Sequence, residues 1–169
     1  MRVMNKEQLI YYLTGFVDAE GCFCVSLKKQ QSAKVRWVLD PVFHVTQHED
    51  SREILDILKE TIGCGRVIKK YGQDNTLQFY VHSRKDLMEC IIPFFKKYKL
   101  VTKNRDFEIF AEIVEALAKH KHGNLDEFRV LLKKAFTMNR GGKQRRYNLK
   151  EVLNSLGSSE TIRQTQSKF

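Results

Sequence analysis

The sequence predicts an α+β domain with the element order αββαββα, in which a four-stranded antiparallel sheet carries helices on one face and further helices follow. Apolar residues recur at helical spacing in some segments and at every second position in others, with turn residues between them. The chain has 169 residues, and 42% of them are hydrophobic, which is enough for one core. We expect a single domain over 1–156 and a frayed tail over 157–169.

The first helix is predicted over 7–18. Asn5 is a suitable N-cap, and Gln8 completes a capping-box pattern with it. Apolar residues cover most of the circumference of this helix, so it should be buried on more than one side. Thr14 and Gly15 are small, so another backbone could approach closely there. Gly21 ends the helix.

Alternation of apolar and polar residues predicts two β-hairpins joined by a helix over 50–62. The four strands are expected over 22–30, 35–47, 66–71 and 77–82. Polar turns over 31–33 and 72–75 would close the two hairpins. Pro41 points to an edge position or a bulge.

Helical spacing returns in the second half of the chain. Helices are expected over 86–95, with a break or kink near Pro93, and over 106–119, 125–136 and 149–156. A basic connection over 96–103 precedes the second of these helices, and a basic loop over 140–146 precedes the last.

The net charge is +10, from 30 lysines and arginines against 20 acidic residues, which is more than solubility requires. The excess suggests a polyanionic partner, and nucleic acid is the commonest. A basic surface without such a partner, or an anionic membrane, would also explain the charge, but no basic amphipathic helix stands out. There is neither a signal peptide nor a run of about 18 apolar residues, so we expect a soluble intracellular protein that is not secreted.

The outer face of the predicted sheet is mostly polar and basic. It would carry Ser26, Lys28, Gln30, Lys34, Arg36, His44, Arg66, Lys70, Gln78, Tyr80 and His82. Such a mixture of donors, acceptors and positive charge suits base edges and phosphates in a major groove, which admits β-ribbons. An ordinary solvated sheet face would have a similar composition, and the net charge favours DNA.

The four cysteines are Cys22, Cys24, Cys64 and Cys90. The spacing Cys22-x-Cys24 is too tight for an ordinary zinc knuckle, and no second pair accompanies it. We expect the two side chains to point to opposite faces of their strand. Reduced, structural cysteines are therefore the predicted state.

Two carboxylates lie at the end of the first helix, in the segment LTGFVDAEG over 13–21. The helix macrodipole disfavours Asp18 and Glu20 there unless a cation binds. Unpaired carbonyls at the same helix end are hard oxygen ligands of the kind that Mg²⁺ accepts. The alternative is that both carboxylates bind neighbouring amides or form salt bridges.

The same segment closely resembles the motif that names the LAGLIDADG homing endonucleases. Two further segments agree: IGCGRV over 62–67 resembles the family's Gly-x-Gly turn before the second hairpin, and IIPFFKKYKLVTKNRDF over 91–107 resembles the stretch leading into the next helix. The resemblance covers roughly residues 5–155. It implies a metal-dependent, site-specific DNA endonuclease that uses Mg²⁺ or Mn²⁺.

The resemblance assigns roles to the motif. Glu20 would bind the metal through its carboxylate, and Ala19 through its backbone carbonyl. Asp18 would mainly support the helix end. The motif helices of the family pack side by side at the dimer axis, which places Leu13, Thr14, Gly15 and Asp18 at the interface.

The motif occurs once, which implies a homodimer and a palindromic or near-palindromic site. Strands of about nine residues span roughly 30 Å, or about nine base pairs, so a dimer should cover on the order of 20 base pairs. Two acidic sites close to the axis would act on phosphates facing each other across the minor groove. The expected products carry short 3′ overhangs.

Other catalytic and DNA-binding residues follow from the resemblance. Gln47 matches a polar residue that orders water near the metal. Lys103 is the first candidate, and Lys99 the second, for a basic residue that polarises the site. A set of basic residues, Arg140, Lys143, Arg145 and Arg146, resembles a C-terminal loop that grips backbone phosphates and adds affinity without sequence information.

Three alternatives are weaker. An intron RNA-splicing maturase or a non-catalytic DNA-binding regulator can be built on this fold, but Glu20 favours cleavage and no separate DNA-binding domain is added. An unrelated basic binding module would not match three segments in order. A start at Met1 favours an intron-encoded protein over an intein domain.

Overall fold

The computed structural model describes residues 4–33, 35–120, 123–139 and 145–156. Helix α1 (Lys6–Glu20) begins at the predicted capping box: Asn5 Oδ1 accepts the Gln8 amide at 2.9 Å, and Gln8 Oε1 accepts the Asn5 amide at 3.0 Å. The helix ends at Gly21, where an added Cβ would lie 2.6 Å from the Val17 carbonyl oxygen. A side chain at this position would therefore collide with the helix that it leaves.

The sheet has four strands in the order β1-β2-β4-β3, and every pair is antiparallel. The strands are β1 (Gly21–Lys29), β2 (Trp37–His48), β3 (Arg66–Lys69) and β4 (Thr76–Val81). The predicted hairpins are thus confirmed. Strand β4 pairs with β2 only from Phe43 onward, so Pro41 has a neighbouring strand on one side alone, as expected of an edge position.

The helices agree with the predicted order. They are α2 (Arg52–Ile62), α3 (Arg84–Asp86), α4 (Ile92–Lys97), α5 (Asn104–Ala118) and α6 (Leu125–Thr137), with a 3₁₀ turn over Glu49–Ser51 before α2. Residues 149–156 form one more helix. None of the helices in the described ranges is long and apolar enough to span a membrane.

The break expected near Pro93 lies just before that residue. A wide π-helical turn over Leu87–Ile91 separates α3 from α4, and the Ile92 amide donates to the Leu87 carbonyl five residues back. Pro93 then occupies the first turn of α4, where its missing N–H costs no hydrogen bond.

Aromatic rings join the sheet to the helices that cover it. Phe23 of β1 stacks on Phe43 of β2, with ring centroids 4.8 Å apart. Edge contacts of 5.5 Å to Phe95 and 5.4 Å to Phe107 connect this pair to α4 and α5. Val152 and Leu156 are also buried in the same core, so the helix over 149–156 belongs to this domain.

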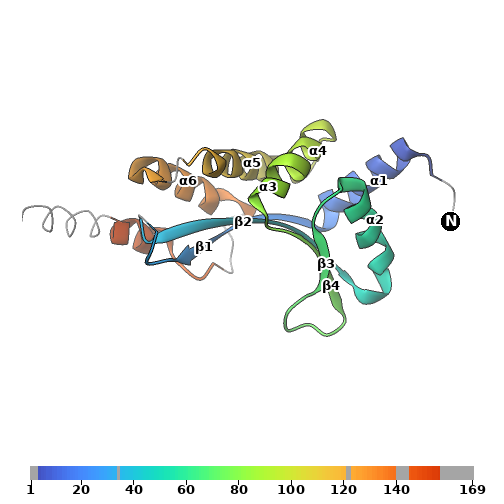
Figure 1. Cartoon of the computed structure of the whole chain (residues 1–169), viewed down its shortest axis with the longest axis horizontal. Coiled ribbons are helices and arrows are strands. Elements are labelled where there is room, and N and C mark those ends of the chain that lie inside the picture. The colour runs from blue at the N-terminus through green and yellow to red at the C-terminus, as the bar shows by residue number, and fades with distance from the viewer. Residues whose placement is uncertain (1–3, 34, 121–122, 140–144, 157–169) are drawn as a thin grey trace, which may run out of the picture.

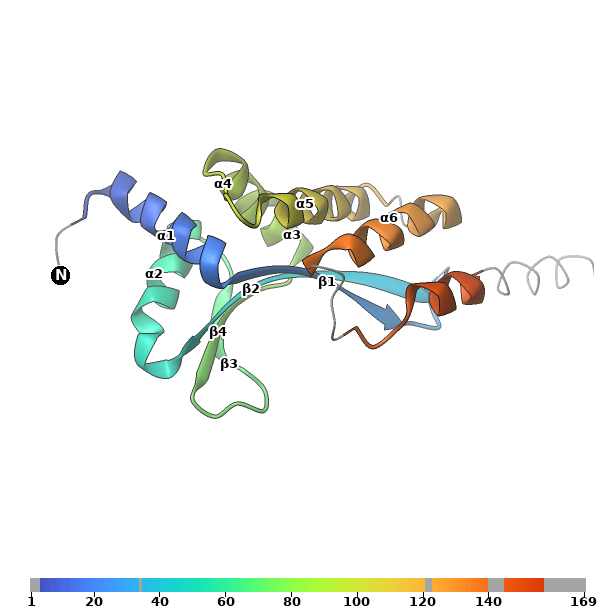
Figure 2. The same cartoon turned by 180° about the vertical axis from the view of Figure 1, so that it is seen from behind.

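The opposite face of the sheet is less covered. Buried residues alternate with half-buried or exposed ones along β1 and β4, and the core-facing set includes Phe23, Val25 and Phe79. Figures 1 and 2 show α4, α5 and α6 on one side of the curved sheet, whereas the turn between β3 and β4 projects on the other. The outer side of β1, β2, β3 and β4 is called the outer sheet face below.

Candidate functional site

The carboxylate of Asp18, at the end of α1, holds the segment that precedes α5. Its oxygens accept the Val101 amide at 3.1 Å, the Thr102 amide at 2.9 and 3.1 Å, and the Lys103 amide at 2.9 Å. The Thr102 hydroxyl also donates to the Asp18 carbonyl at 3.2 Å. Asp18 therefore positions residues 101–103 beside the C-terminal end of α1.

These hydrogen bonds also set the acidity of Asp18. Burial by itself would raise the pKa of this carboxyl, but the amides of Thr102, Lys103 and Val101 and the Thr102 side chain together hold it below the ordinary 3.8. The group is therefore a stable anion at neutral pH.

The ammonium of Lys103 lies against the last carbonyls of α1. Its Nζ is 2.5 Å from the Ala19 oxygen and 2.6 Å from the Asp18 oxygen. Carbonyls at a helix C-terminus lack intrahelical partners and carry the negative end of the macrodipole, so they attract a cation. Lys99 lies elsewhere: it lines a hollow between α4 and α5 together with Lys96 and Glu108.

Glu20 is the last residue of α1, and Gln47 belongs to β2, the strand that pairs with β1. The Glu20 side chain is exposed. Val45 pairs with Gly21, the residue after Glu20, so Gln47 lies at the end of the sheet where α1 runs into β1. The fold thus brings Gln47 and Lys103, which are far from the motif in sequence, to the end of the sheet where Ala19 and Glu20 lie.

The expected interface residues do not share one surface. Leu13 is fully buried in the core of this chain, and Thr14 is 7% exposed with its hydroxyl donating to the Ile10 carbonyl at 2.8 Å. Neither side chain is available to a partner, so the prediction that Leu13 and Thr14 lie at the dimer interface is corrected. One face of α1 packs against the core of its own subunit, and both residues lie on that face. Gly15 is exposed, and a Cβ built there meets nothing within 4 Å.

An exposed stripe of α1 runs through Gly15. Tyr12, with 52% of its surface exposed, precedes it by three residues, and Ala19 follows by four. Residues three and four apart share a helix face. Tyr12, Gly15 and Ala19 are called the α1 stripe below.

The outer sheet face carries the residues expected to bind DNA, and some of them interact with neighbouring side chains of the sheet. Lys28 forms a 2.5 Å salt bridge with Asp40, an acidic neighbour that sequence reasoning did not place there. Gln78 donates to Thr46 at 3.3 Å, and the rings of Tyr80 and His82 lie 5.4 Å apart. The remaining expected residues among the described ranges, exposed or half-buried on strands and turns, are Ser26, Gln30, Arg36, His44, Arg66 and Lys70.

The C-terminal basic residues divide into two kinds. The guanidinium of Arg145 is half-buried, donates to the carbonyls of Val25 and Ala135, and lies over the Phe136 ring at 4.5 Å. Its burial lowers its pKa. Arg146 is exposed beside Tyr147. Arg145 thus fastens this segment to β1, whereas Lys34, Arg140 and Lys143 lie outside the described residues.

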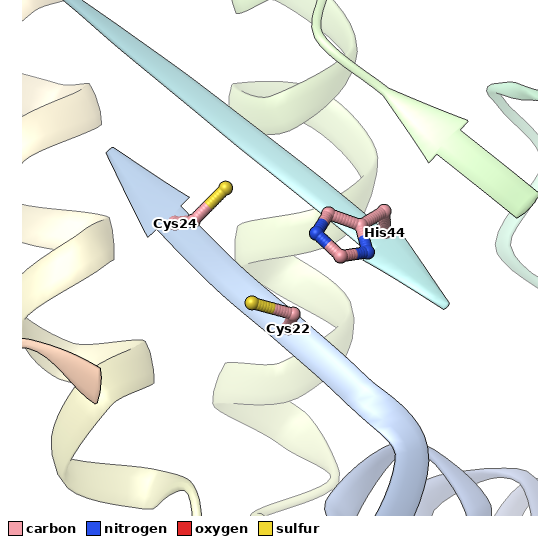
Figure 3. Close-up of side chains that lie close together, drawn as sticks. All are labelled: Cys22, Cys24 and His44. Atoms are coloured by element: carbon pink, nitrogen blue, oxygen red, sulfur yellow. The ribbon is translucent and has the colours of Figure 1, made fainter. Parts of the chain in front are cut away.

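Cys22 and Cys24 share one side of β1 with His44 of β2, contrary to the expectation of opposite faces. Side chains alternate along a strand, so residues two apart point the same way. Cys22 pairs directly with His44 in the sheet, and Figure 3 shows the three side chains close together on the two neighbouring strands. A hydrogen bond with Cys24 lowers the pKa of Cys22 to about 5, against burial and with help from His44 and Lys103, while the pKa of Cys24 is raised.

Comparison with known proteins identifies the family in which this geometry occurs. A family model described as LAGLIDADG endonuclease matches residues 13–114. A relative from Aeropyrum pernix, the homing endonuclease I-ApeII, is 33% identical over 163 residues, which cover 94% of this chain and 96% of the relative.

Solved structures agree. The archaeal intron-encoded homing endonuclease I-Vdi141I, solved in complex with DNA, superimposes with a TM-score of 0.86 at 33% identity over 93% of this chain and 99% of that one. I-SmaMI, bound to an uncleaved DNA target in the presence of calcium ions, gives a TM-score of 0.75 at 26% identity. The match to I-SmaMI covers 84% of this chain and 47% of that chain.

Proposed function

The chain belongs to the LAGLIDADG endonuclease family, and on that premise we propose that it cuts both strands of a specific DNA site as a metal-dependent homodimer. Site-specific DNA cleavage agrees with the names of its relatives, the homing endonuclease I-ApeII and the DNA endonuclease I-CreI. The observation that carries the proposal is the Lys103 ammonium held against the Asp18 and Ala19 carbonyls beside the free carboxylate of Glu20.

The donors at this helix end fit a hard divalent cation. Mg²⁺ and Mn²⁺ prefer oxygen ligands, and Glu20 and Ala19 offer a carboxylate and a carbonyl. The Lys103 ammonium lies 2.5 Å from the Ala19 carbonyl, so this oxygen already attracts positive charge, and the lysine would move aside for an ion bound there. A bound ion would supply charge against the phosphate and make a bound water more acidic.

The protein's own groups would then complete the site. The hydrogen bonds from the amides of residues 101–103 to the Asp18 carboxylate hold the backbone of this segment. Lys103 would then supply positive charge to a phosphate next to Glu20. Gln47, from β2, would orient the attacking water by hydrogen bonding. Lys99 takes no part in this assignment, because it lines the hollow between α4 and α5.

The α1 stripe is the proposed dimer contact. Gly15 leaves room for a second helix, since nothing in its own subunit lies within 4 Å of a Cβ there. Two subunits packed through this stripe would bring two Glu20 carboxylates near the symmetry axis. The scissile phosphates would then face each other across the minor groove, and the products would carry 3′ overhangs.

Sequence recognition would come from the outer sheet face. Ser26, Gln78, Tyr80 and Arg66 would reach base edges in a major groove, and a dimer would cover on the order of 20 base pairs. Exposed Arg146 would contact backbone phosphates and give affinity that falls with salt.

A cleavage selection tests the proposal. Purified protein and Mg²⁺ would be incubated with a pool of random or genomic duplexes, and the cut ends sequenced. We expect cuts at one near-palindromic site with 3′ overhangs, abolished by EDTA and by Glu20→Gln. The matched control is Glu7→Gln, an exposed acid in the first turn of the same helix, which should cut at the wild-type rate.

Other outcomes would overturn the proposal in different ways. Tight duplex binding without cleavage in Mg²⁺ or Mn²⁺ would indicate a regulator, and preference for structured RNA a maturase. Cleavage retained in Glu20→Gln would refute the metal assignment while leaving the endonuclease activity standing.

A further inference from the structure

A second group of metal-ligating side chains lies on the outer sheet face. The sulfur atoms of Cys22 and Cys24 and an imidazole nitrogen of His44 all lie within 4.8 Å of one another. In the part of the chain that the structure describes, no other group of three histidine, cysteine or acidic side chains meets this spacing. Two of the three ligands share strand β1, and the third is directly opposite on β2.

The backbone holds this arrangement without a special loop. Residues two apart on β1 and a directly paired residue on β2 must project from the same face of the sheet. Gly21 to Lys29 pair with β2 without interruption, so the three Cβ positions are fixed by the ladder. Side-chain rotation would bring the ligand atoms, which Figure 3 shows close together, to metal-binding distances.

The donor set is soft, unlike the oxygen ligands at Glu20. Two thiolates and an imidazole select Zn²⁺ and related ions rather than Mg²⁺. With Zn–S near 2.3 Å and Zn–N near 2.0–2.1 Å, tetrahedral ligands lie about 3.5–3.8 Å apart. The observed spread of up to 4.8 Å closes to that value by small changes in side-chain torsion.

His44 carries an independent sign of a missing partner. Its Nδ1 atom is buried and has no hydrogen-bond partner among the described residues. Buried polar nitrogens are rarely left unsatisfied, because removing them from water without a new hydrogen bond is unfavourable. A metal removes this cost only if it binds Nδ1; if it binds the other ring nitrogen, Nδ1 needs a partner such as a bound water.

An ion could reach the cluster from one side. Cys22 and Cys24 line a hollow between β1 and the C-terminal segment, which also includes Ser26, Asn139 and Arg145. The hollow leaves space for water or another small ligand in the coordination position that the protein does not fill. The cluster is therefore half-buried and open, rather than sealed in the core.

We propose that Cys22, Cys24 and His44 bind a single thiophilic divalent cation, of which Zn²⁺ is the first candidate, at a site separate from the hard-cation site of Glu20. Binding would hold both cysteines as thiolates and cross-link β1 to β2 two residues after Glu20. It would also withdraw His44 from base contact and set the shape and charge of the outer sheet face nearest the cleavage end. The proposal does not depend on endonuclease activity.

Cobalt substitution and thiol protection test the proposal on the full-length protein without DNA. Metal-free reduced protein would be titrated with Co²⁺ and then with Zn²⁺. We expect a thiolate-to-cobalt charge-transfer band that saturates at a single ion per chain and is displaced by Zn²⁺. Oxygen ligands at Glu20 give no such band. In alkylation followed by mass spectrometry, Zn²⁺ should protect Cys22 and Cys24 but not the remaining two of the four cysteines.

Variants separate a ligand role from a packing role. Cys22→Ser with Cys24→Ser should lose the band and the protection, as should His44→Gln. His44→Cys should keep both, since a third thiolate replaces the imidazole. The matched control, Cys64→Ser with Cys90→Ser, alters the other partly buried cysteines and should bind Co²⁺ like wild type.

Three results would overturn the site. One is a charge-transfer band that persists in the Cys22→Ser, Cys24→Ser protein. Another is equal alkylation of Cys22 and Cys24 with and without Zn²⁺ in folded protein, checked by thermal unfolding. The third is a Cys22–Cys24 disulfide that survives in reductant and prevents metal binding.

Discussion

Replacing Asp18 with Asn should destabilise the fold by breaking the clamp between α1 and residues 101–103. The carboxylate accepts three backbone amides, from Val101, Thr102 and Lys103, at 2.9–3.1 Å. An asparagine offers one acceptor oxygen, and its NH₂ group would face amides that also donate. At least one amide of the segment then loses its partner.

The size of the loss follows from the hydrogen bonds. A hydrogen bond to a charged group contributes about 1.5–3 kcal/mol, and the carboxylate is partly exposed, so we expect Asp18→Asn to cost about 2 kcal/mol. For a domain of this size, 1 kcal/mol shifts Tm by about 2–4 °C, so Tm should fall by about 4–8 °C.

The pH dependence gives a second signature. Because folding holds the pKa of Asp18 below 3.8, its charge contributes stability above that pH, and the contribution is lost as the pH falls through the lowered value. The difference in unfolding free energy between wild type and Asp18→Asn should therefore be full at neutral pH and shrink in acid below 3.8.

Thermal and urea unfolding of both proteins in EDTA would measure this difference. Asp74→Asn, at an exposed position in the turn between β3 and β4, is the control and should change stability by less than about 0.5 kcal/mol. Equal stability of wild type and Asp18→Asn at neutral pH, or a difference that grows in acid, would refute the reasoning.

Three further predictions address other parts of the structure. Gly65→Ala should lower the free energy of unfolding by about 2–4 kcal/mol, because Gly65 has φ +80° and an added Cβ would lie 2.7 Å from the Phe79 ring. A urea unfolding midpoint equal to that of wild type would contradict this packing. Gly15→Leu should leave the circular dichroism of the chain unchanged and make it sediment as a monomer, whereas an intact dimer would exclude the α1 stripe as the contact. Arg146→Gln should make the logarithm of the DNA-binding constant depend less steeply on the logarithm of the salt concentration, by about 1 in slope per subunit, and leave the sequence preference unchanged. An altered sequence preference would mean that Arg146 contacts bases.

Local sequence patterns predicted most of the fold. Alternation along 22–30 and 77–82 predicted strands, and the Asn5–Gln8 capping box predicted where α1 begins. These features depend on residues close in sequence, which is why they could be inferred. The same holds for the break near Pro93, although the structure places the distorted turn just before it.

Features that depend on distant contacts were missed or misplaced. Leu13 and Thr14 look like neighbours of Gly15 in sequence, but the helix turns them into their own core. From the sequence, Arg145 was expected to bind backbone phosphates, but in the structure its guanidinium donates to the Val25 and Ala135 carbonyls. The proximity of His44 to Cys22 and Cys24 could not be predicted, because it depends on the register of β1 against β2, which no local pattern specifies.

Two lysines in one segment allow the most direct test of the proposed cleavage site. Lys103 donates to the Ala19 and Asp18 carbonyls, whereas Lys99, four residues earlier, lines the hollow between α4 and α5. Single-turnover cleavage would be measured for Lys103→Met and Lys99→Met at saturating protein in Mg²⁺. We expect Lys103→Met to be slower by about 10²–10³-fold and Lys99→Met to match wild type. Equal rates for both variants, or a loss confined to Lys99→Met, would contradict the assignment of catalysis to this end of α1.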